Sequence, residues 1–448
     1  MTVSSTVEDR RPLTSLATDV LVVGGGAAGL AAAVTAARQG VKALLLERYG
    51  FCGGAAVAGL SGTVCGMYEA SSDPNSRPRK LLHGFIDDFI KVMEARDGLT
   101  PPVRYGKTFT RVHDPLVWRE TADLLLREAG VHILFHAVVT NVLTDGERIA
   151  GVRAFTKQGP VEVRAKLTID ASGDADVASM AGLPTFMGKN GKIQNPTMIF
   201  RILGVDVGRF IAAYGPDTIM GEAVSDIIHR LRNSRDYTLP RTKIFLFSTP
   251  RPGELLCNAT RIVGRGGREL NPLLVEDITE AEIEGRKQVR EYARFIKNHL
   301  AGCENSFVND TGVQVGVRQT RQIVGRAMLS NSDVVTGHKT TDGIARSPWP
   351  IELHSGSKPK LEWLIHDYYE VPYDCFVPQT GESLLIAGRC LSAEHEAMAS
   401  ARVTGPCFGY GHAIGHAAAI AVKDNISPRN LKGADIRERL NRDGAQLG

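Results

Sequence analysis

The residues in this chain whose types and spacing best suit a chemical task are three glycines and one acid. Gly24, Gly26 and Gly29 follow the pattern G-x-G-x-x-G, and Glu47 lies about 20 residues further on. The first glycine permits a tight turn, the second lets a pyrophosphate approach the backbone, and the third lets a helix pack closely on a strand. A carboxylate at the later position accepts a hydrogen bond from a ribose hydroxyl. The combination predicts a dinucleotide site, and a tight turn in an ordinary α/β domain is the alternative.

The segments around these glycines predict the elements that such a site needs. The apolar run at 20–23 is typical of a parallel strand that is buried on both faces. An alanine-rich stretch from about 27 to 38 predicts a helix, which Gly40 ends. A second strand at 42–46 then leads into Glu47. The unpaired amides and the positive dipole end at the start of the helix would hold the phosphates.

The composition of the 448-residue chain argues against several classes of protein. Its net charge of +4 is scattered, so it favours neither nucleic acid nor a membrane as a partner. Seven cysteines without a C-x-x-C pair argue against a disulfide framework and a cysteine-ligated metal, so we predict no metal and a cytoplasmic location. Residues 1–18 lack the apolar core of a signal peptide. The apolar stretch 403–422 contains two histidines and four glycines, which indicates a buried helix rather than a membrane span.

The order of strand and helix patterns predicts an α/β fold with a discontinuous, Rossmann-like first domain. Residues 17–183 form its first part and residues 376–448 its carboxyl-terminal part. Residues 184–375 form an inserted substrate or cap domain of mixed α+β character, largely antiparallel.

Within the inserted domain the sequence predicts several particular elements. Strands are expected at 197–203, 243–248 and 313–317. A long helix is expected to begin at Thr279, whose hydroxyl would form a capping box with Glu282.

Three motifs together resemble a known family. They are VVGGGAAGLAAAVTAARQGVKALLLER near the amino end, TIDASGDADVASMAG in the middle, and LLIAGRCLSAEHEAMASARVTGPC near the carboxyl end. The chain is similar to FAD-dependent oxidoreductases with the glutathione-reductase type of FAD fold. The carboxyl-terminal motif and VGVRQTRQIVG at 315–325 resemble a bacterial subfamily within that group.

The resemblance implies which residues would hold FAD. The pyrophosphate would lie on the glycine turn, the adenosine near Glu47, and the flavin near the loop after Phe51 and the start of a late helix. In chain order the cofactor-binding residues would be Gly24, Gly26, Ala27, Ala28, Gly29, Glu47, Arg48, Gly53, Gly54, Ala55, Val139, Ala171, Ser172, Gly173, Gly388, Arg389 and Gly405. Relatives often carry Gly-Asp where this chain has Gly388-Arg389, so the acid that binds the ribityl chain is absent here. No second glycine fingerprint for NAD(P)H is present, since the cluster at 264–267 has the wrong spacing.

Flavin chemistry needs a substrate to be positioned and a proton to be moved. The candidates for these tasks are His395, His354, Arg318 and Tyr373. His395 follows a strand end, where such folds bind ligands, but it could instead cap a helix. His354 could be a solvent-exposed loop histidine, Arg318 an interdomain ion-pair partner, and Tyr373 a packing residue.

These features predict an FAD-dependent dehydrogenase or oxidase that transfers a hydride from a small organic substrate to the flavin. The substrate would lie between the two domains. One alternative is a flavoprotein electron-transfer subunit that needs a redox partner protein, and another is a non-redox isomerase or binding protein that contains FAD. A homo-oligomer is compatible with each of these hypotheses.

Overall fold

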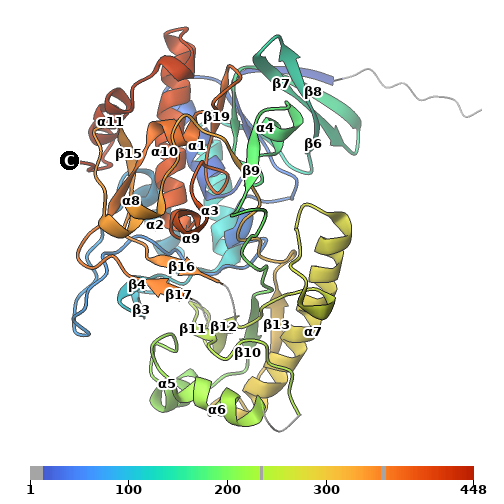
Figure 1. Cartoon of the computed structure of the whole chain (residues 1–448), viewed down its shortest axis with the longest axis vertical. Helices are drawn as coiled ribbons and strands as arrows, with labels where there is room; N and C mark the ends of the chain where they lie inside the picture. Colours follow the sequence, from blue (N-terminus) through green and yellow to red (C-terminus); the bar gives the residue numbers. More distant parts are fainter. Residues whose placement is uncertain (1–13, 233–235, 355–359) are drawn as a thin grey trace, which may run out of the picture.

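The computed structural model describes residues 14–232, 236–354 and 360–448. The expectation about a signal peptide rests largely on residues 1–13, which lie outside these ranges. The described chain forms two units that lie end to end (Figure 1). One contains the main sheet with α1 and α10, and the other contains β10 to β13 with α5, α6 and α7.

The main sheet has the strand order β5-β2-β1-β8-β7-β6, with β19 also pairing with β8. Strands β1, β2, β5 and β19 run parallel to β8. Strand β7 pairs antiparallel with the first half of β8, and β6 pairs antiparallel with β7. The apolar residues at 20–23 are at most 5% exposed, as predicted for a strand that is covered on both faces. The strands are β1 (Thr14–Val23), β2 (Ala43–Leu46), β5 (His132–Leu134), β6 (Val138–Asp145), β7 (Arg148–Thr156), β8 (Gly159–Asp170) and β19 (Leu384–Ile386).

Two helices from opposite ends of the chain pack together against this sheet. They are α1 (Ala27–Arg38) and α10 (Thr404–Lys423). A Cβ atom on Gly411 would lie 2.1 Å from the carbonyl oxygen of Ala28, so only glycine lets the helices approach this closely. The prediction of a buried helix at 403–422 is therefore confirmed. Within the described ranges, no helix has both the length and the apolar character needed to cross a membrane.

The same unit contains further helices and short strand pairs. The helices are α2 (Phe85–Glu94), α3 (Pro115–Glu128), α4 (Asp176–Met180), α8 (Asn331–Thr336), α9 (His395–Ala401) and α11 (Gly433–Arg442). The paired strands are β3 (Val103–Tyr105) with β4 (Thr108–Thr110), β9 (Thr185–Met187) with β14 (Arg321–Ile323), β15 (Gly343–Ser347) with β18 (Tyr369–Pro372), and β16 (Ile351–Leu353) with β17 (Lys360–Glu362).

The second unit is built on an antiparallel sheet with the order β11-β12-β10-β13. The expected strands at 197–203 and 243–248 are present but shorter. The elements are β10 (Phe200–Leu203), β11 (Phe245–Ser248), β12 (Glu254–Asn258), β13 (Phe307–Thr311), α5 (Val207–Tyr214), α6 (Ala223–Arg232) and α7 (Val275–His299).

Two local predictions in this unit are wrong. Helix α7 begins at Val275, four residues before the expected start, because acidic side chains in its first turn stabilise an earlier end. The Thr279 hydroxyl donates to the carbonyl of Val275, and Glu282 accepts from the backbone amide of Val315, so neither side chain caps the helix. The expected strand at 313–317 is an irregular segment with one bridge, Gly316 to Thr197, because its residues bond to two different elements.

The packing divides the chain differently from the expected domain boundary at residue 375. Buried residues from Leu329 to Val377 belong to the same core as α1 and α10. The separate core of the second unit begins at Met198 and ends at Val315. The expected inserted domain of 184–375 thus divides between two cores.

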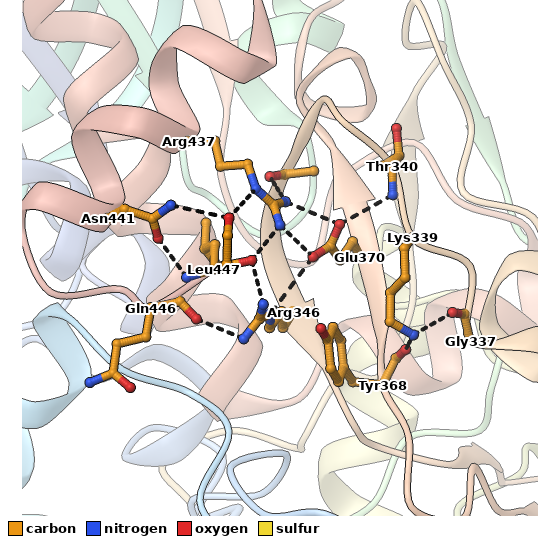
Figure 2. Close-up of polar contacts among 12 residues, drawn as sticks. Gly337, Lys339, Thr340, Arg346, Tyr368, Glu370, Arg437, Asn441, Gln446 and Leu447 are labelled. Carbon is orange, nitrogen blue, oxygen red and sulfur yellow. Dashed lines mark hydrogen bonds and ion pairs between the residues drawn. The ribbon is translucent and has the colours of Figure 1, made fainter.

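A polar cluster ties the carboxyl-terminal segment to the β15–β18 pair (Figure 2). Buried Glu370 accepts hydrogen bonds from both terminal nitrogens of Arg437, at 3.0 and 2.9 Å, and lies 3.6 Å from Nε of Arg346. Both arginines also donate to the carbonyl of Leu447. The cluster fixes α11 beside the strands that follow α8.

Candidate functional site

The turn between β1 and α1 uses its three glycines for three different purposes. Gly24 has a φ of +100°, which an L side chain rarely adopts. A Cβ atom on Gly29 would lie 1.8 Å from the carbonyl oxygen of Gly24, so this glycine permits the contact between helix and strand. A Cβ atom on Gly26 would meet only Gly54 Cα within 4 Å, at 3.8 Å, so the space beside Gly26 is open.

No side chain of α1 itself competes for the amino end of the helix. Gly26 is the N-cap residue, no side chain caps the helix, and its first turn contains no acid. Helix amides that lack an intrahelical partner point out of such an end and attract anions. This end is therefore available to a phosphate.

Glu47 combines a structural contact with access to the same space. Its Oε2 accepts from the amide of Gly25 at 2.7 Å, and its Oε1 accepts from the amide of Tyr49 at 2.9 Å. Burial raises the pKa of the carboxyl group, and these two amides pull it down. Each oxygen keeps a free lone pair, so Glu47 is able to accept a ribose hydroxyl as well.

One cavity brings together nearly all the residues that were predicted to bind the cofactor. It is lined by Gly24, Gly26, Ala27, Ala28, Glu47, Arg48, Gly53, Gly54, Ala55, Val139, Ala171, Ser172, Gly173, Gly388 and Arg389. Gly29 and Gly405 lie outside the lining. Sequence segments that are far apart thus meet around one space, at the carboxyl ends of β1, β2 and β8.

The resemblance implies Gly-Asp at the position of Gly388-Arg389. The side chain of Arg389 bonds to other residues of the protein and does not replace the missing acid. Arg389 Nη2 donates to Asp174 Oδ1 at 2.8 Å, and Nη1 donates to the hydroxyl of Thr320 at 3.2 Å. Burial alone would raise the pKa of Asp174, but Arg389 and the Thr320 hydroxyl together hold this pKa below its ordinary value. The backbone of Gly388 and Arg389 remains for contacts with a ligand.

Helix α10 begins at Thr404, with Val403 as its N-cap. Thr404 and Cys407 line the cavity. Gly405 faces the other way: its amide donates to the carbonyl of Cys65 at 2.8 Å, and a Cβ atom there would lie 2.6 Å from that oxygen. The amino end of α10 therefore reaches the cavity through Thr404 rather than through Gly405.

Sequence reasoning missed several lining residues: Tyr49, Asp176, Gln314, Arg402 and Thr404. Asp176 and Arg402 lie inside the quoted motifs, so the motifs could have indicated them. Burial, and then the charges of Asp174 and Asp170, raise the pKa of Asp176 to about 6. Gln314 comes from the second unit, and no local pattern indicated that it would reach the cavity.

Two of the predicted catalytic residues belong to a buried polar cluster beside the cavity. His354 Nε2 lies 3.2 Å from Glu352 Oε1. Burial and the charge of Arg318 lower the pKa of His354 to about 3, so its imidazole is neutral at physiological pH. Arg318 is 7% exposed and donates from Nη1 to the carbonyl of Asn195 at 2.7 Å.

The other two predicted residues lie elsewhere. His395 is the first residue of α9 and is absent from the cavity lining, and burial lowers its pKa. Tyr373 is 1% exposed, and its hydroxyl donates to the carbonyl of Pro428 at 2.9 Å. Burial raises the pKa of Tyr373 far above its ordinary value, as expected of a packing residue.

The fold and the cavity define an α/β protein with a parallel-sheet core and a nucleotide-sized site at the strand ends. The chain belongs to the FAD dependent oxidoreductase family, whose model matches residues 19–440. It is therefore a flavoprotein of the oxidoreductase class, with FAD as its cofactor. The glycine beside open space, the uncapped helix end and the partly free carboxylate suit a dinucleotide with a pyrophosphate.

Curated relatives match only part of this chain. A thiamine thiazole synthase of Methanococcus vannielii is 29% identical over 170 residues, which cover 36% of this chain and 58% of the relative. A digeranylgeranylglycerophospholipid reductase of Picrophilus torridus is 28% identical over 196 residues, covering 42% and 47%. The chain thus spans about half the length of these relatives.

Among solved structures, a geranylgeranyl bacteriochlorophyll reductase-like protein of Thermoplasma acidophilum has a TM-score of 0.48 and 15% identity. The alignment covers 96% of this chain and 83% of that one.

Proposed function

We propose that this protein is a dehydrogenase or oxidase in which FAD lies in the cavity described above and a small organic substrate binds between the two units. Its FAD domain is Rossmann-like and of the glutathione-reductase type, within the bacterial subfamily that the carboxyl-terminal motif resembles. The observation that carries the proposal is the position of Arg402, which lines the cavity and also contacts Gln194 beside the buried cluster around Arg318.

In this proposal the chain's own residues perform three tasks. The amides at the start of α1 hold the pyrophosphate, and Glu47 accepts a ribose hydroxyl. The amino end of α10, at Thr404, favours negative charge in the cavity. Bound FAD would accept a hydride from the substrate.

On the substrate side, Arg318 orients the substrate and neutral His354 accepts a hydrogen bond from it. A group with a pKa of about 3 is a weak base at pH 7, so we assign positioning, rather than proton removal, to His354. The proposed compartment is the cytoplasm, since the cysteines are buried as free thiols, which a reducing environment maintains.

The test is an anaerobic screen of small organic substrates against the purified protein, followed through the visible flavin band. Bleaching by a small molecule is the expected result. Reduction only in the presence of a second protein would support an electron-transfer subunit instead. A flavin that stays oxidised with every donor would favour a non-redox role, and a colourless protein to which FAD does not bind would refute the proposal.

A further inference from the structure

A group of buried arginines lies beside the cofactor cavity, on the side of the second unit. Arg318 and Arg402 are held by consecutive residues, since Arg318 donates to the Asn195 carbonyl at 2.7 Å and Arg402 Nη2 donates to Gln194 Oε1 at 3.1 Å. Arg318 follows the irregular segment after β13, and Arg402 ends α9. Their guanidinium groups therefore approach the same region from separate elements.

Arg241 reaches this region from the loop before β11. It is 3% exposed, its Nη1 donates to Asn258 Oδ1 at 3.0 Å, and its guanidinium lies over the ring of Phe245 at 4.9 Å. Phe245 packs edge-on against Tyr105, with 5.8 Å between the ring centroids. This places Arg241 next to the polar group formed by Tyr105 and Glu352.

Glu352 is the acid of this cluster, and its oxygens already have partners. It accepts from the Tyr105 hydroxyl at 2.7 Å and from Trp349 Nε1 at 3.3 Å, and it lies 3.2 Å from His354 Nε2. Burial would raise its pKa, yet His354, Tyr105 and Arg402 hold that pKa at about 2. Glu352 is therefore ionised at every physiological pH.

The charges in this cluster do not cancel among the described residues. Arg241, Arg318 and Arg402 each carry a positive charge, Glu352 carries one negative charge, and His354 is neutral. Burial lowers the pKa of Arg318, and the neighbouring Arg402 and Arg241 lower it further, as expected of cations packed together.

Buried donors in the cluster also lack acceptors. Within the described parts of the chain, Nη2 of Arg241, Nε of Arg402 and Nε2 of Gln194 are buried without a hydrogen-bond partner. An unpaired buried charge is costly, so a cluster of this kind is normally completed by an anion. A carboxylate suits it, because a guanidinium binds both of its oxygens at once.

We propose that Arg241, Arg318 and Arg402 bind a small organic acid with two or more carboxylates and hold it beside the flavin. The inference rests on the proposed function, because it takes the space next to the FAD cavity as the substrate site. A dicarboxylate suits the cluster because three arginines against one Glu352 leave two positive charges unmatched, and each carboxylate of such a ligand offers two oxygens to a guanidinium group. Arg402 lines the cavity itself and would direct one end of the ligand toward the cofactor.

The first experiment measures binding by calorimetry on the purified, FAD-loaded protein. The probes are malonate, succinate and glutarate, with propionate, inorganic phosphate and neutral succinamide for comparison. At least one dicarboxylate should bind about ten- to a hundred-fold more tightly than propionate and phosphate, and succinamide should not bind. Equal affinities, or tighter binding of phosphate, would overturn the proposal.

The second experiment compares Arg318→Gln and Arg241→Gln with Arg261→Gln. Arg261 is a matched control, since its Nε donates to Asn195 Oδ1 at 3.1 Å but the side chain is only partly buried. Each cluster variant should raise the dicarboxylate Kd about ten- to a hundred-fold, and the control should leave the Kd unchanged. Arg318→Lys keeps the positive charge but loses the paired donors of the guanidinium group. It replaces Arg318→Gln in this experiment if the glutamine variant does not fold. An unchanged Kd in the folded cluster variants would also overturn the proposal.

Flavin content, read from absorbance, separates this inference from the proposed function. Calorimetry detects the acid whether or not FAD is present. A protein that binds dicarboxylates but never FAD would refute the proposed function and keep the anion site. A yellow protein whose flavin is reduced by a substrate but which binds no dicarboxylate would support the proposed function and refute the anion site.

Discussion

The two sides of the site are built by different means. The pyrophosphate turn of the cofactor side consists of backbone and small residues within one stretch of chain, where Gly24, Gly26 and Gly29 set a turn and Glu47 follows the next strand. The substrate side consists of long charged side chains, such as Arg318 and Arg402, brought together from distant segments and buried. The first kind of site does not tolerate added atoms, and the second is sensitive to changes of charge.

The largest expected effect is on the free energy of unfolding, when a Cβ atom is added within the glycine turn. Gly29→Ala would place a Cβ atom 1.8 Å from the Gly24 carbonyl oxygen, so we expect unfolding or a loss of about 3 kcal/mol or more in the free energy of unfolding. Gly26→Ala is the matched control for folding, because its Cβ atom would meet only Gly54 Cα, at 3.8 Å. It should fold normally but bind FAD weakly. Urea unfolding and flavin content measure both effects, and a Gly29→Ala protein of native stability would contradict the comparison.

The next prediction concerns the acid that follows the glycine turn on the cofactor side. Glu47→Ala removes a ribose acceptor, so the Kd for FAD should rise about ten- to a hundred-fold. The Kd of Glu47→Gln for FAD should lie between those of the wild type and Glu47→Ala, because the amide nitrogen of glutamine replaces one of the two accepting oxygens. Flavin fluorescence on dilution gives the Kd, and an unchanged Kd for Glu47→Ala would show that the ribose binds elsewhere.

The stability of the protein should depend on pH through His113, which lies beside the contact between the two units. Its neighbour Asp114 is paired with Arg251 of the second unit, and both ring nitrogens of His113 are buried without a partner in the described chain. Burial lowers the pKa of His113 to about 4. Below pH 6.5 the unfolded chain binds the extra proton, so stability is complete above that pH and is lost as the pH falls toward 4.

Between pH 7 and pH 5 this histidine should reduce the free energy of unfolding by about 2 kcal/mol. His113→Phe keeps the ring packed on Trp118, whose centroid lies 4.6 Å away, and removes the titration. Urea unfolding at both pH values measures the difference. Equal pH dependence in the variant and the wild type would contradict the assignment.

The smallest effect tests whether the amino end of α10 tunes the cofactor. Thr404→Asp places a negative charge at the cavity, so the flavin midpoint potential should fall by about 5–20 mV, which corresponds to about 0.3–1 kcal/mol. Lys423→Gln, at the far end of the same helix, is the control and should change nothing. Spectroscopic redox titration at full flavin content measures both, and a raised or unchanged potential in Thr404→Asp would refute the role.

The cofactor side could be predicted because its signals are local. The turn, the first helix and the acid lie within one short stretch, and the prediction of a parallel-sheet core needed only the apolar strands around them. The buried helix α10 was equally evident from its composition.

The substrate side could not be predicted in the same way. Arg241 and Gln194 carry no local pattern, and their positions depend on contacts between distant segments. The same reason explains why buried residues of 329–377 pack with the first core, since tertiary contacts decide that packing.

The pairing of α1 with α10 has a consequence for the newly synthesised chain. Helix α1 is complete once residue 38 has been made, but the helix that covers it begins at residue 404. At about 5–20 residues per second, roughly 20–70 s pass between the two events. During that time the side of α1 that packs on α10 lacks its native cover, while β1, β2 and α3 are already available to cover the rest. Exposed apolar surface of this kind promotes aggregation, so we expect the first part of the chain to be most prone to it before α10 has been made.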